Sequence, residues 1–408
     1  MKSNYKLLGD YIREINARNT ELKDLDLLGI SIQKEFIPSI ANTIGTDMSK
    51  YKIVKKNQFA YGTVTSRNGD KISIALLQNH EEALISQAYI SFEVIDENKL
   101  LPEYLMMWFR RPEFDRYARY MSYGSAREVF SWEEMCNVKL PIPSIEKQRE
   151  IVKEYNAIID RIKLNENMIG KLEELAQSIY KQWFIDFNYE DENVRAYKEE
   201  GGTVYFNSEL DKEIPTEWDV IKIKDFGTVI TGKTPSSKNP EDFGEKMPFV
   251  TPGDFKNYNK FVLGAERNLS DLGINRLKSK VLRNRSVIVT CIGSDMGKVV
   301  LSQGECITNQ QMNSIIVNKD YYSDYLYYNL KLRSSELKSI ALGGSTMPML
   351  NKSEFESINI LKPDDNILDK FSDILNPINQ EIIVKSRMIK LLYDMKYIML
   401  SRISNMGE

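Results

Sequence analysis

The chain has 408 residues, of which 42% are hydrophobic and 28% are charged, and its net charge at pH 7 is −3. This length exceeds that of one ordinary core and predicts two or three domains. No apolar run approaches the roughly 20 residues that cross a bilayer, and the N-terminus lacks the apolar stretch of a secretory signal, so we expect a cytoplasmic protein rather than a membrane or exported one.

The first head, residues 1–143, is predicted to mix strands and helices. β-Branched and aromatic residues with turn punctuation favour strands over residues 52–64, 71–77 and 88–94, and residues 102–120 favour helix. A proline-marked boundary then ends at Ser144, which is a suitable N-cap for the next element.

A long helix is predicted over residues 144–187. Apolar residues recur at alternate spacings of four and three from Ile151 to Trp183, and Asn165 is a polar member of this heptad seam. The roughly 33 residues would span about 50 Å, far more than an average helix. We therefore expect an extended coiled coil, with a helical hairpin that serves only as core as the alternative. The connection over residues 188–214 is acidic and long enough to return the chain across the molecule.

The second head is expected over residues 215–363 and the second long helix over residues 364–405. In this head, strands are predicted over residues 287–292, 298–301 and 314–317, and a helix over residues 325–341. Asp364 is a suitable N-cap, and the second seam runs from Phe371 to Ile403 with Lys385 in the position of Asn165. Pro377 should kink this helix or delay its regular part.

The chain aligns with itself at a constant offset of 220 residues. Gly124 falls on Gly344, and without a gap Pro143 then meets Pro363. The chain is therefore a tandem duplication. The predicted fold class is α+β: two similar mixed α/β heads joined by two long antiparallel coiled-coil helices, related by a pseudo-twofold axis.

The small net charge hides two locally basic regions. Lysine and arginine dominate from Phe255 to Arg285 and from Lys50 to Lys71, while the acids concentrate in the predicted helices and around residues 186–200. Such regions can contact nucleic acid, although a solvated face is the more ordinary explanation of each.

One motif resembles a nucleotide-binding loop and is rejected. Residues 227–234, Gly-Thr-Val-Ile-Thr-Gly-Lys-Thr, match the P-loop pattern. A P-loop needs a helix directly after its Gly-Lys so that the helix N-terminus can hold phosphate. Val229 and Ile230 favour a strand instead, and Pro235 and Pro240 exclude a proper helix.

Other catalytic patterns also fail. The run from Asn239 to Asp242 departs from a methyltransferase motif at its third and fourth places, and the pair Glu336 and Lys338 has nuclease spacing without a framed upstream aspartate. His80 stands in a polar turn and should be solvated. The three cysteines, Cys136, Cys291 and Cys306, are far apart and should be buried thiols rather than disulfides or a zinc site. No metal site and no catalytic site are predicted.

The chain resembles the specificity subunits of type I restriction-modification systems over essentially its whole length, in the order head, helix, head, helix. The most specific segments are Leu172 to Phe187 (Leu-Glu-Glu-Leu-Ala-Gln-Ser-Ile-Tyr-Lys-Gln-Trp-Phe-Ile-Asp-Phe), Ile214 to Trp218, Gly232 to Pro235, Pro248 to Asp254, and Gly344 to Thr346 leading to Pro363. Head 1 departs from the pattern, because its opening from Lys6 to Asp10 has no Gly-x-Thr-Pro element.

The resemblance implies a non-catalytic subunit that binds double-stranded DNA. Each head would be a target-recognition domain for one half of a split DNA site, and the helix pair would fix their separation. Two methyltransferase (modification) subunits would dock along the helices, with restriction-translocase subunits added outside. S-adenosylmethionine, ATP and magnesium would belong to those partners.

Polar and basic residues in both heads are the candidate DNA contacts, with basic members positioning on phosphate and amides and hydroxyls reading bases. In head 1 they are Thr63, Thr65, Ser66, Arg67, Asn68, Tyr123, Ser125 and Arg127. In head 2 they are Lys233, Thr234, Ser236, Ser237, Lys238, Asn239, Lys256, Asn257, Asn259, Lys260, Asn309, Gln310, Gln311, Asn313, Ser345 and Thr346. For the run 309–313, a hydrogen-bond network at a strand edge is an equal alternative.

Three other functions remain open from the sequence. A fused methyltransferase or nuclease is disfavoured by the missing motifs. A coiled-coil scaffold whose heads bind protein is opposed by the basic loops and the family resemblance. The chain could also serve a system that only methylates DNA.

Overall fold

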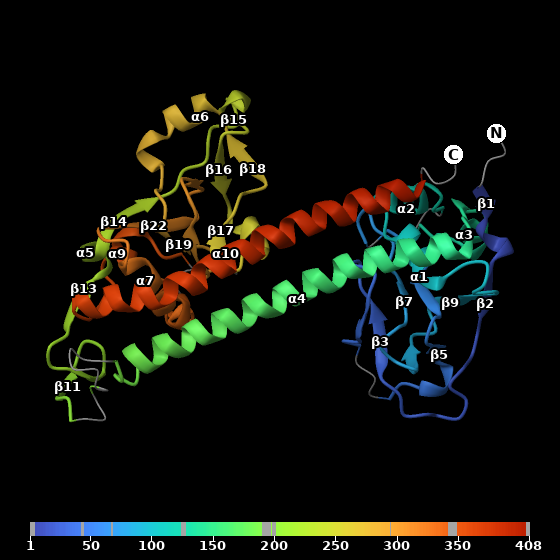
Figure 1. Ribbon diagram of the computed structural model, residues 1–408, viewed down its shortest axis with the longest axis horizontal. Coiled ribbons are helices and arrows are strands. Elements are labelled where there is room, and N and C mark those ends of the chain that lie inside the picture. The colour runs from blue at the N-terminus through green and yellow to red at the C-terminus, as the bar shows by residue number, and fades with distance from the viewer. Residues whose placement is uncertain are drawn as a thin grey trace. The chain divides into compact units, whose positions relative to one another are not determined.

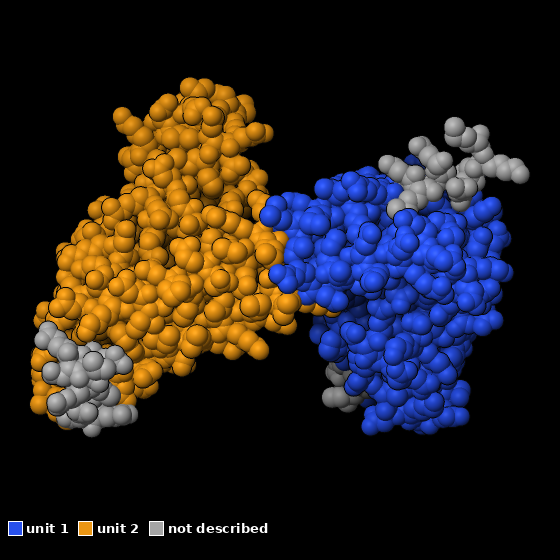
Figure 2. All heavy atoms as spheres, viewed as in Figure 1, with its two compact units in different colours: residues 1–162, 391–408 blue, residues 163–390 orange. Residues whose placement is uncertain are grey.

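The computed structural model describes residues 5–41, 45–66, 68–123, 128–189, 197, 201–293, 295–341 and 349–404. The chain divides into two compact units (Figure 2): unit 1 contains residues 1–162 and 391–408, and unit 2 contains residues 163–390. Head 1 therefore belongs to unit 1 and head 2 to unit 2. Within the described residues, no helix has the length and apolar character needed to span a membrane.

Head 1 is built on two four-stranded sheets, with strand orders β2-β9-β6-β7 and β4-β3-β8-β5, and on the pair β1-β10. The strands are β1 (Tyr5–Leu7), β2 (Ile12–Ile15), β3 (Leu27–Ile30), β4 (Phe36–Pro38), β5 (Lys52–Lys55), β6 (Phe59–Gly62), β7 (Ile74–Leu76), β8 (Glu82–Ile85), β9 (Tyr89–Val94) and β10 (Lys139–Pro141). The helices are α1 (Pro102–Phe109), α2 (Pro112–Tyr120) and α3 (Trp132–Cys136). Helices α1 and α2 both begin at proline, which is tolerated there because the first-turn N–H groups have no helical partner.

An aromatic core joins the first sheet of head 1 to α1. Phe59 and Phe92 lie on adjacent strands with stacked rings whose centroids are 4.8 Å apart, and Phe109 of α1 packs edge-on against both. All three side chains are fully buried. Each such ring pair contributes about 0.5–1.5 kcal/mol beyond its area burial. The helix is thus held firmly on the sheet.

Head 2 is built on a five-stranded sheet, β14-β22-β19-β20-β17, a four-stranded sheet, β15-β18-β16-β21, and the pairs β13-β23 and β11-β12. The strands are β11 (Val204–Asn207), β12 (Lys212–Pro215), β13 (Asp219–Lys222), β14 (Gly227–Thr231), β15 (Phe243–Gly244), β16 (Met247–Val250), β17 (Phe261–Val262), β18 (Arg267–Leu269), β19 (Val287–Thr290), β20 (Val299–Ser302), β21 (Ile307–Thr308), β22 (Met312–Val317) and β23 (Asn359–Lys362). The helices are α5 (Ile223–Phe226), α6 (Asp271–Arg276), α7 (Tyr322–Leu332), α8 (Ser334–Ala341) and α9 (Lys352–Glu356).

The duplication expected from the sequence is visible in the topology of the two heads. The order β2-β9-β6-β7 in head 1 corresponds to β14-β22-β19-β20 in head 2, and the matching strand pairs are antiparallel in both. Helix α1 contacts β7 just as α7 contacts β20. Head 2 has one strand more, because β17 pairs in parallel with the outer edge of β20. Among the described residues, no strand pairs with the corresponding edge of β7.

Two long helices, α4 (Ile145–Phe184) and α10 (Asp365–Arg402), contain 40 and 38 residues (Figure 1). At 1.5 Å per residue, each is about 60 Å long. Within unit 1, the early residue Ile151 of α4 shares a core cluster with Leu400 near the end of α10. Within unit 2, Trp183 near the end of α4 packs against Phe371 near the start of α10, with ring centroids 6.0 Å apart. The helices therefore run antiparallel, as predicted.

The heptad seams are buried or partly buried, and their polar members are Asn165, Lys385 and Lys396. Asn165 of α4 is 1% exposed, and the Lys385 side chain of α10 is 15% exposed and forms an ion pair of 3.2 Å with Glu381. Pro377 lies inside α10, and the helix begins before it and continues beyond it, so the regular part is not delayed.

Candidate nucleic-acid interface

Two of the predicted recognition segments of head 2 lie together. The loop after β14 packs on residues 308–310: the Lys233 amide donates to the Thr308 carbonyl oxygen at 2.9 Å, and the Thr234 hydroxyl is hydrogen-bonded to the Gln310 side chain. Gly232 makes this approach possible, because a Cβ at that position would overlap the carbonyl oxygens of Thr308 and Asn309. The two loops therefore form one polar surface.

Most of the predicted residues of these two loops can reach solvent. Exposed or partly exposed side chains are Lys233, Thr234, Ser236, Ser237, Lys238, Asn239, Gln310 and Gln311. Lysines of this kind neutralise phosphates, and hydroxyl and amide groups hydrogen-bond base edges. These side chains therefore offer positive charge and hydrogen-bonding groups to a ligand. Their contact with DNA remains a prediction.

The rejected P-loop match is excluded by the local structure. Residues 227–231 form strand β14, and the next regular segment is a short 3₁₀ turn at Pro240–Asp242 rather than a helix opening at Lys233. No row of helix N-terminal amides therefore follows the Gly-Lys pair, and a phosphate group could not be held in the P-loop manner.

The third predicted set, Lys256, Asn257, Asn259 and Lys260, lies on a separate loop, residues 252–259, and directly after it. The loop contains a 3₁₀ segment, Pro252–Asn257, capped by Asp254, whose carboxylate accepts hydrogen bonds from the Thr251 amide at 2.8 Å and from the Glu266 amide at 2.8 Å. The loop leaves Lys256 and Asn257 exposed. Asn259 is also exposed, and its amide group donates to the Ser386 hydroxyl of α10 at 3.3 Å.

Four of the predicted contacts are wrong, because their side chains are buried in bonds to the protein itself. Lys260 is fully buried in an ion pair with Asp324. The Asn313 side chain donates to the Leu350 carbonyl oxygen at 3.1 Å and accepts from the Thr231 hydroxyl. The Asn309 side chain donates to the Gln311 side-chain oxygen and accepts from the Gln311 backbone amide. Thr65 is 2% exposed and bonds to the Glu128 carbonyl oxygen at 3.3 Å. For Asn309 and Asn313, the strand-edge network was the correct alternative.

In head 1, the structure brings two predicted segments together. Val129 pairs with both Val64 and Tyr123, so the start of the loop after β6 lies beside these two residues. Thr63, Ser66 and Asn68 are accessible, and Tyr123 is 63% exposed. The predicted residues Arg67, Ser125, Arg127, Ser345 and Thr346 lie outside the described residues.

The same arrangement in head 2 reveals a loop that the sequence analysis missed. Ile292, just after β19, pairs with Met349, and the Leu350 amide donates to the Cys291 carbonyl oxygen at 2.9 Å. The β19–β20 loop, residues 291–298, is therefore the counterpart of the β6–β7 loop that carries Thr63 to Asn68. Matching the loops through their flanking strands could have found it, because β19 and β20 were both predicted.

Glu336, the carboxylate of the rejected nuclease-like pair, is bonded to Arg333. Arg333 forms two hydrogen bonds to the Glu336 carboxylate, at 2.7 and 2.6 Å. Among the described residues, no group of three or more His, Cys, Asp or Glu side chains is placed to hold a metal ion. His80 was expected to be solvated and is only partly exposed; its Nε2 lies 3.4 Å from the Asp26 carboxylate.

Comparison with known proteins identifies the family. The model of the type I restriction modification DNA specificity domain matches residues 13–174 and 215–390. The chain is 26% identical over 407 residues to the type I restriction enzyme HindI specificity subunit of Haemophilus influenzae, covering 88% of this chain and 87% of that protein. It is 32% identical over 183 residues to the MjaIX specificity subunit of Methanocaldococcus jannaschii, covering 44% of this chain and 42% of that protein.

A solved structure shares the fold. The S subunit of a type I restriction-modification system from M. genitalium superposes with a TM-score of 0.59 at 12% identity, covering 99% of this chain and 96% of that chain. The similarity therefore extends over both heads and both long helices. The two matched domains cover more than half of the chain and show that it belongs to the type I restriction-modification DNA specificity family.

Proposed function

We propose that this chain is the non-catalytic, sequence-reading subunit of a type I restriction-modification enzyme, and that each head reads one half of a bipartite DNA site. The observation that carries the proposal is the repeated sheet order of the two heads, which places the β6–β7 and β19–β20 loops in equivalent positions. Two recognition domains with the same topology suit two half-sites, as in other DNA-binding proteins with twofold symmetry.

The surfaces of the two heads support reading rather than chemistry. The accessible lysines Lys233, Lys238 and Lys256 would contact phosphates and set the position of head 2 on the duplex. The hydroxyl and amide groups beside them, such as Thr234 and Gln310, would contact base edges. Specificity would then reside in the loops, which can vary without disturbing the sheets that carry them.

The long helices are the proposed docking surface for two methyltransferase subunits. Away from the buried seam, Leu164, Met168 and Leu175 of α4 are exposed, and positions 220 residues later on α10 carry Val384, Met388 and Met395, of which Val384 and Met395 are about half exposed. Spacings of four and seven residues place each set on one helix face. Two matching apolar faces suit two copies of one partner.

In this proposal the cofactors belong to the partners. The methyltransferase subunits would bind S-adenosylmethionine, and the restriction-translocase subunits would bind ATP and magnesium. This chain would select the DNA site at which those subunits act.

The test is to coexpress the chain with its methyltransferase in a host without other adenine methylation, and to map methylated adenines across the genome. We expect one bipartite site whose two halves are separated by unspecified bases. The host with the methyltransferase alone is the control and should show no such site. A single uninterrupted target would overturn the two-reader proposal, and methylation independent of this chain would overturn its role in specificity.

A further inference from the structure

Lys260 is a buried cation whose hydrogen-bonding capacity is fully used. Its side chain has no exposure, and its ammonium group lies 2.8 Å from the Asp324 carboxylate, 2.8 Å from the Asn379 side-chain oxygen and 3.3 Å from the Tyr328 hydroxyl. An ammonium group has three N–H donors, so all three are satisfied. The charge also lies 4.6 Å from the ring centroid of Tyr328 and 4.9 Å from that of Tyr327, which adds cation–π attraction.

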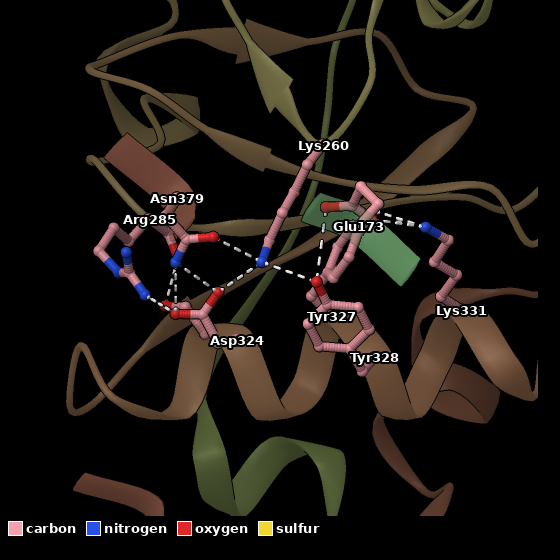
Figure 3. Close-up of polar contacts among 9 residues, drawn as sticks. Glu173, Lys260, Arg285, Asp324, Tyr327, Tyr328, Lys331 and Asn379 are labelled. Atoms are coloured by element: carbon pink, nitrogen blue, oxygen red, sulfur yellow. Dashed lines mark hydrogen bonds and ion pairs between the residues drawn. The ribbon is translucent and has the colours of Figure 1, made fainter. Parts of the chain in front are cut away.

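Asp324 is held between two cations. One carboxylate oxygen contacts Lys260, the other contacts Arg285, and the Asn379 amide group donates to both at 3.0 and 3.2 Å. Burial acts to raise the pKa of Asp324, but the charges of Lys260 and Arg285 outweigh it and hold the pKa below its usual value. We call these four residues, Lys260, Arg285, Asp324 and Asn379, the Lys260 network (Figure 3).

The network joins four parts of unit 2 at one point. Lys260 ends the exposed loop 252–259 and leads into β17, Arg285 precedes β19, Asp324 lies on α7, and Asn379 lies on α10. The Lys260 carbonyl oxygen also accepts from the Leu301 amide of β20 at 2.8 Å. The end of this loop is therefore attached both to the sheet of head 2 and to a long helix.

A second set of bonds connects the same helix α7 to α4. Glu173 of α4 accepts hydrogen bonds from Tyr327 at 3.2 Å and Tyr328 at 3.4 Å, and forms an ion pair of 2.9 Å with Lys331 (Figure 3). Because Tyr328 also bonds to Lys260, the contacts run without interruption from α10 through the network to α4.

The described residues of head 1 form no counterpart of the Lys260 network, although head 1 is the other copy of the duplication. It lacks a counterpart of β17, and Ile159 occupies the place of Asn379 in the 220-residue repeat. Glu103, which aligns with Asp324, is only partly buried and accepts a hydrogen bond from Gln78 at 3.3 Å. Head 1 does contain a buried ion pair, Lys34 with Asp115 at 2.8 Å, but neither residue belongs to a long helix. The Lys260 network differs from that pair because it includes Asn379 of α10.

Energetics indicate what such a network supplies. Desolvation makes a buried ion pair a weak source of stability, and well-packed apolar residues can often replace such a pair at no loss. What a buried pair supplies is one defined geometry, because each charge is stable only opposite its partner. A fixed geometry is useful at the end of a loop whose exposed residues must meet DNA in register.

We propose that Lys260, Asp324 and Asn379 are positioning residues that tie the end of the 252–259 loop to α10 and so fix the direction in which head 2 presents this loop to its half-site. This inference rests on the DNA-reading function proposed above. In the assembled enzyme these residues touch no base; they act through Lys256, Asn257 and Asn259.

Two variants test the proposal without leaving an unpaired buried charge. Asn379→Ile gives α10 the residue that α4 has at the matching position of the repeat. The triple variant Lys260→Met, Arg285→Met and Asp324→Leu replaces both ion pairs of Asp324 by apolar side chains. Lys319→Met is the matched control, since Lys319 also joins head 2 to α10 through an ion pair of 2.5 Å with Asp365, but at the surface and far from the loop in sequence.

The first measurement is hydrogen exchange of the backbone amides of residues 256–262 in the full chain. We expect exchange at least tenfold faster in both test variants and unchanged in Lys319→Met. Unchanged exchange in both test variants would overturn the proposed tie. This measurement needs no DNA, so it tests the attachment of the loop to α10 separately from the proposed function. Failure of the wild-type chain to direct bipartite methylation would overturn the proposed function and leave this result valid.

The second measurement is methylation of a DNA library randomised in both half-sites, using each variant assembled with the methyltransferase. We expect discrimination at the half-site of head 2 to fall about tenfold while discrimination at the other half-site is retained. A merely structural role would lower methylation at all sites together without changing base preference. Equal loss at both half-sites, or none in either variant, would overturn the proposal.

Discussion

Gly232 lies where the loop after β14 passes closest to the carbonyl groups of Thr308 and Asn309. Gly232→Ala would force these segments apart, because the added methyl group meets backbone rather than a flexible side chain. We expect binding of DNA that contains the half-site of head 2 to weaken about tenfold, which is about 1.4 kcal/mol. Gly29→Ala in head 1 is the control, since a Cβ there meets nothing within 4 Å. Equal binding by both variants would contradict the prediction.

Buried thiols give a second prediction at the scale of residues. Burial raises the pKa of Cys291 to about 11 and that of Cys306 to about 12, from a usual value of 9.0. The thiolate is the reactive form, so neither thiol should react with a disulfide reagent at pH 8 in the native chain, and both should react in urea. Because the folded-state pKa values are raised, stability present below pH 9 should be lost as pH rises from about 9 to 12. Rapid native labelling of either residue would disprove this assignment.

Individual contacts were harder to predict than the loops that carry them. Lys256 and Lys260 lie in one polar run of the sequence, yet one is exposed and the other is the centre of a buried network. The difference comes from Asp324 and Asn379, which are distant in sequence and contact Lys260 in the folded structure, where β17 pairs with β20. Composition predicts a basic loop, and only the tertiary structure decides which of its cations are exposed.

Among the secondary-structure elements, the long helices were the most predictable. The heptad pattern repeats several times along each helix, so one residue that departs from it does not change the helix prediction. Strands gave less signal: the strand predicted over residues 52–64 is two strands, β5 and β6, separated by a turn in which Asn57 has φ of 64°. Very short strands such as β17, with two residues, carry no usable periodicity.

The seam supplies a prediction at the scale of elements. Replacing both Asn165 and Lys385 by leucine should raise the melting temperature, because apolar contacts replace polar groups that are mostly buried. It should also allow DNA half-sites at more than one separation, since polar seam residues can select a single helix alignment. Scanning calorimetry and methylation mapping measure the two effects. Asn167→Leu, at an exposed position of α4, is the control and should change neither. If the double variant keeps both its stability and its spacer, helix register is set elsewhere.

At the scale of the whole molecule, head 2 should be exchangeable. Replacing residues 215–363 by the second head of another family member should change one half-site and leave the other, because the exchanged segment starts at the end of β12 and stops just after β23. The exchange replaces Lys260 and Asp324 but keeps Asn379. The best donors are therefore heads with a lysine and an aspartate at the matching positions. Methylation mapping reads out the result, and simultaneous change of both half-sites would refute independent reading.

Unit 1 depends on residues from both ends of the chain. Ile403 is fully buried in the core cluster that contains Ile151 and Tyr155. Ile403→Ala should therefore destabilise unit 1 by about 2–4 kcal/mol. Leu391→Ala, at a position of α10 that is 63% exposed, should cost less than about 0.5 kcal/mol. Urea unfolding followed by tryptophan fluorescence provides the comparison, and equal effects of the two substitutions would show that the C-terminal turn is not part of this core.

This dependence has a consequence for how the protein is made. A ribosome releases head 1 first, but the core cluster of unit 1 still lacks Leu400 and Ile403, and the Tyr5 hydroxyl still lacks the Ser404 carbonyl oxygen that it reaches at 2.9 Å. Unit 2, residues 163–390, is one continuous segment, and its last residue is synthesised before the last residues of unit 1. Contacts between distant chain positions form slowly, and domains usually fold in order of synthesis. Here the order is reversed at the final step, because the head that is synthesised first is the one that is completed last.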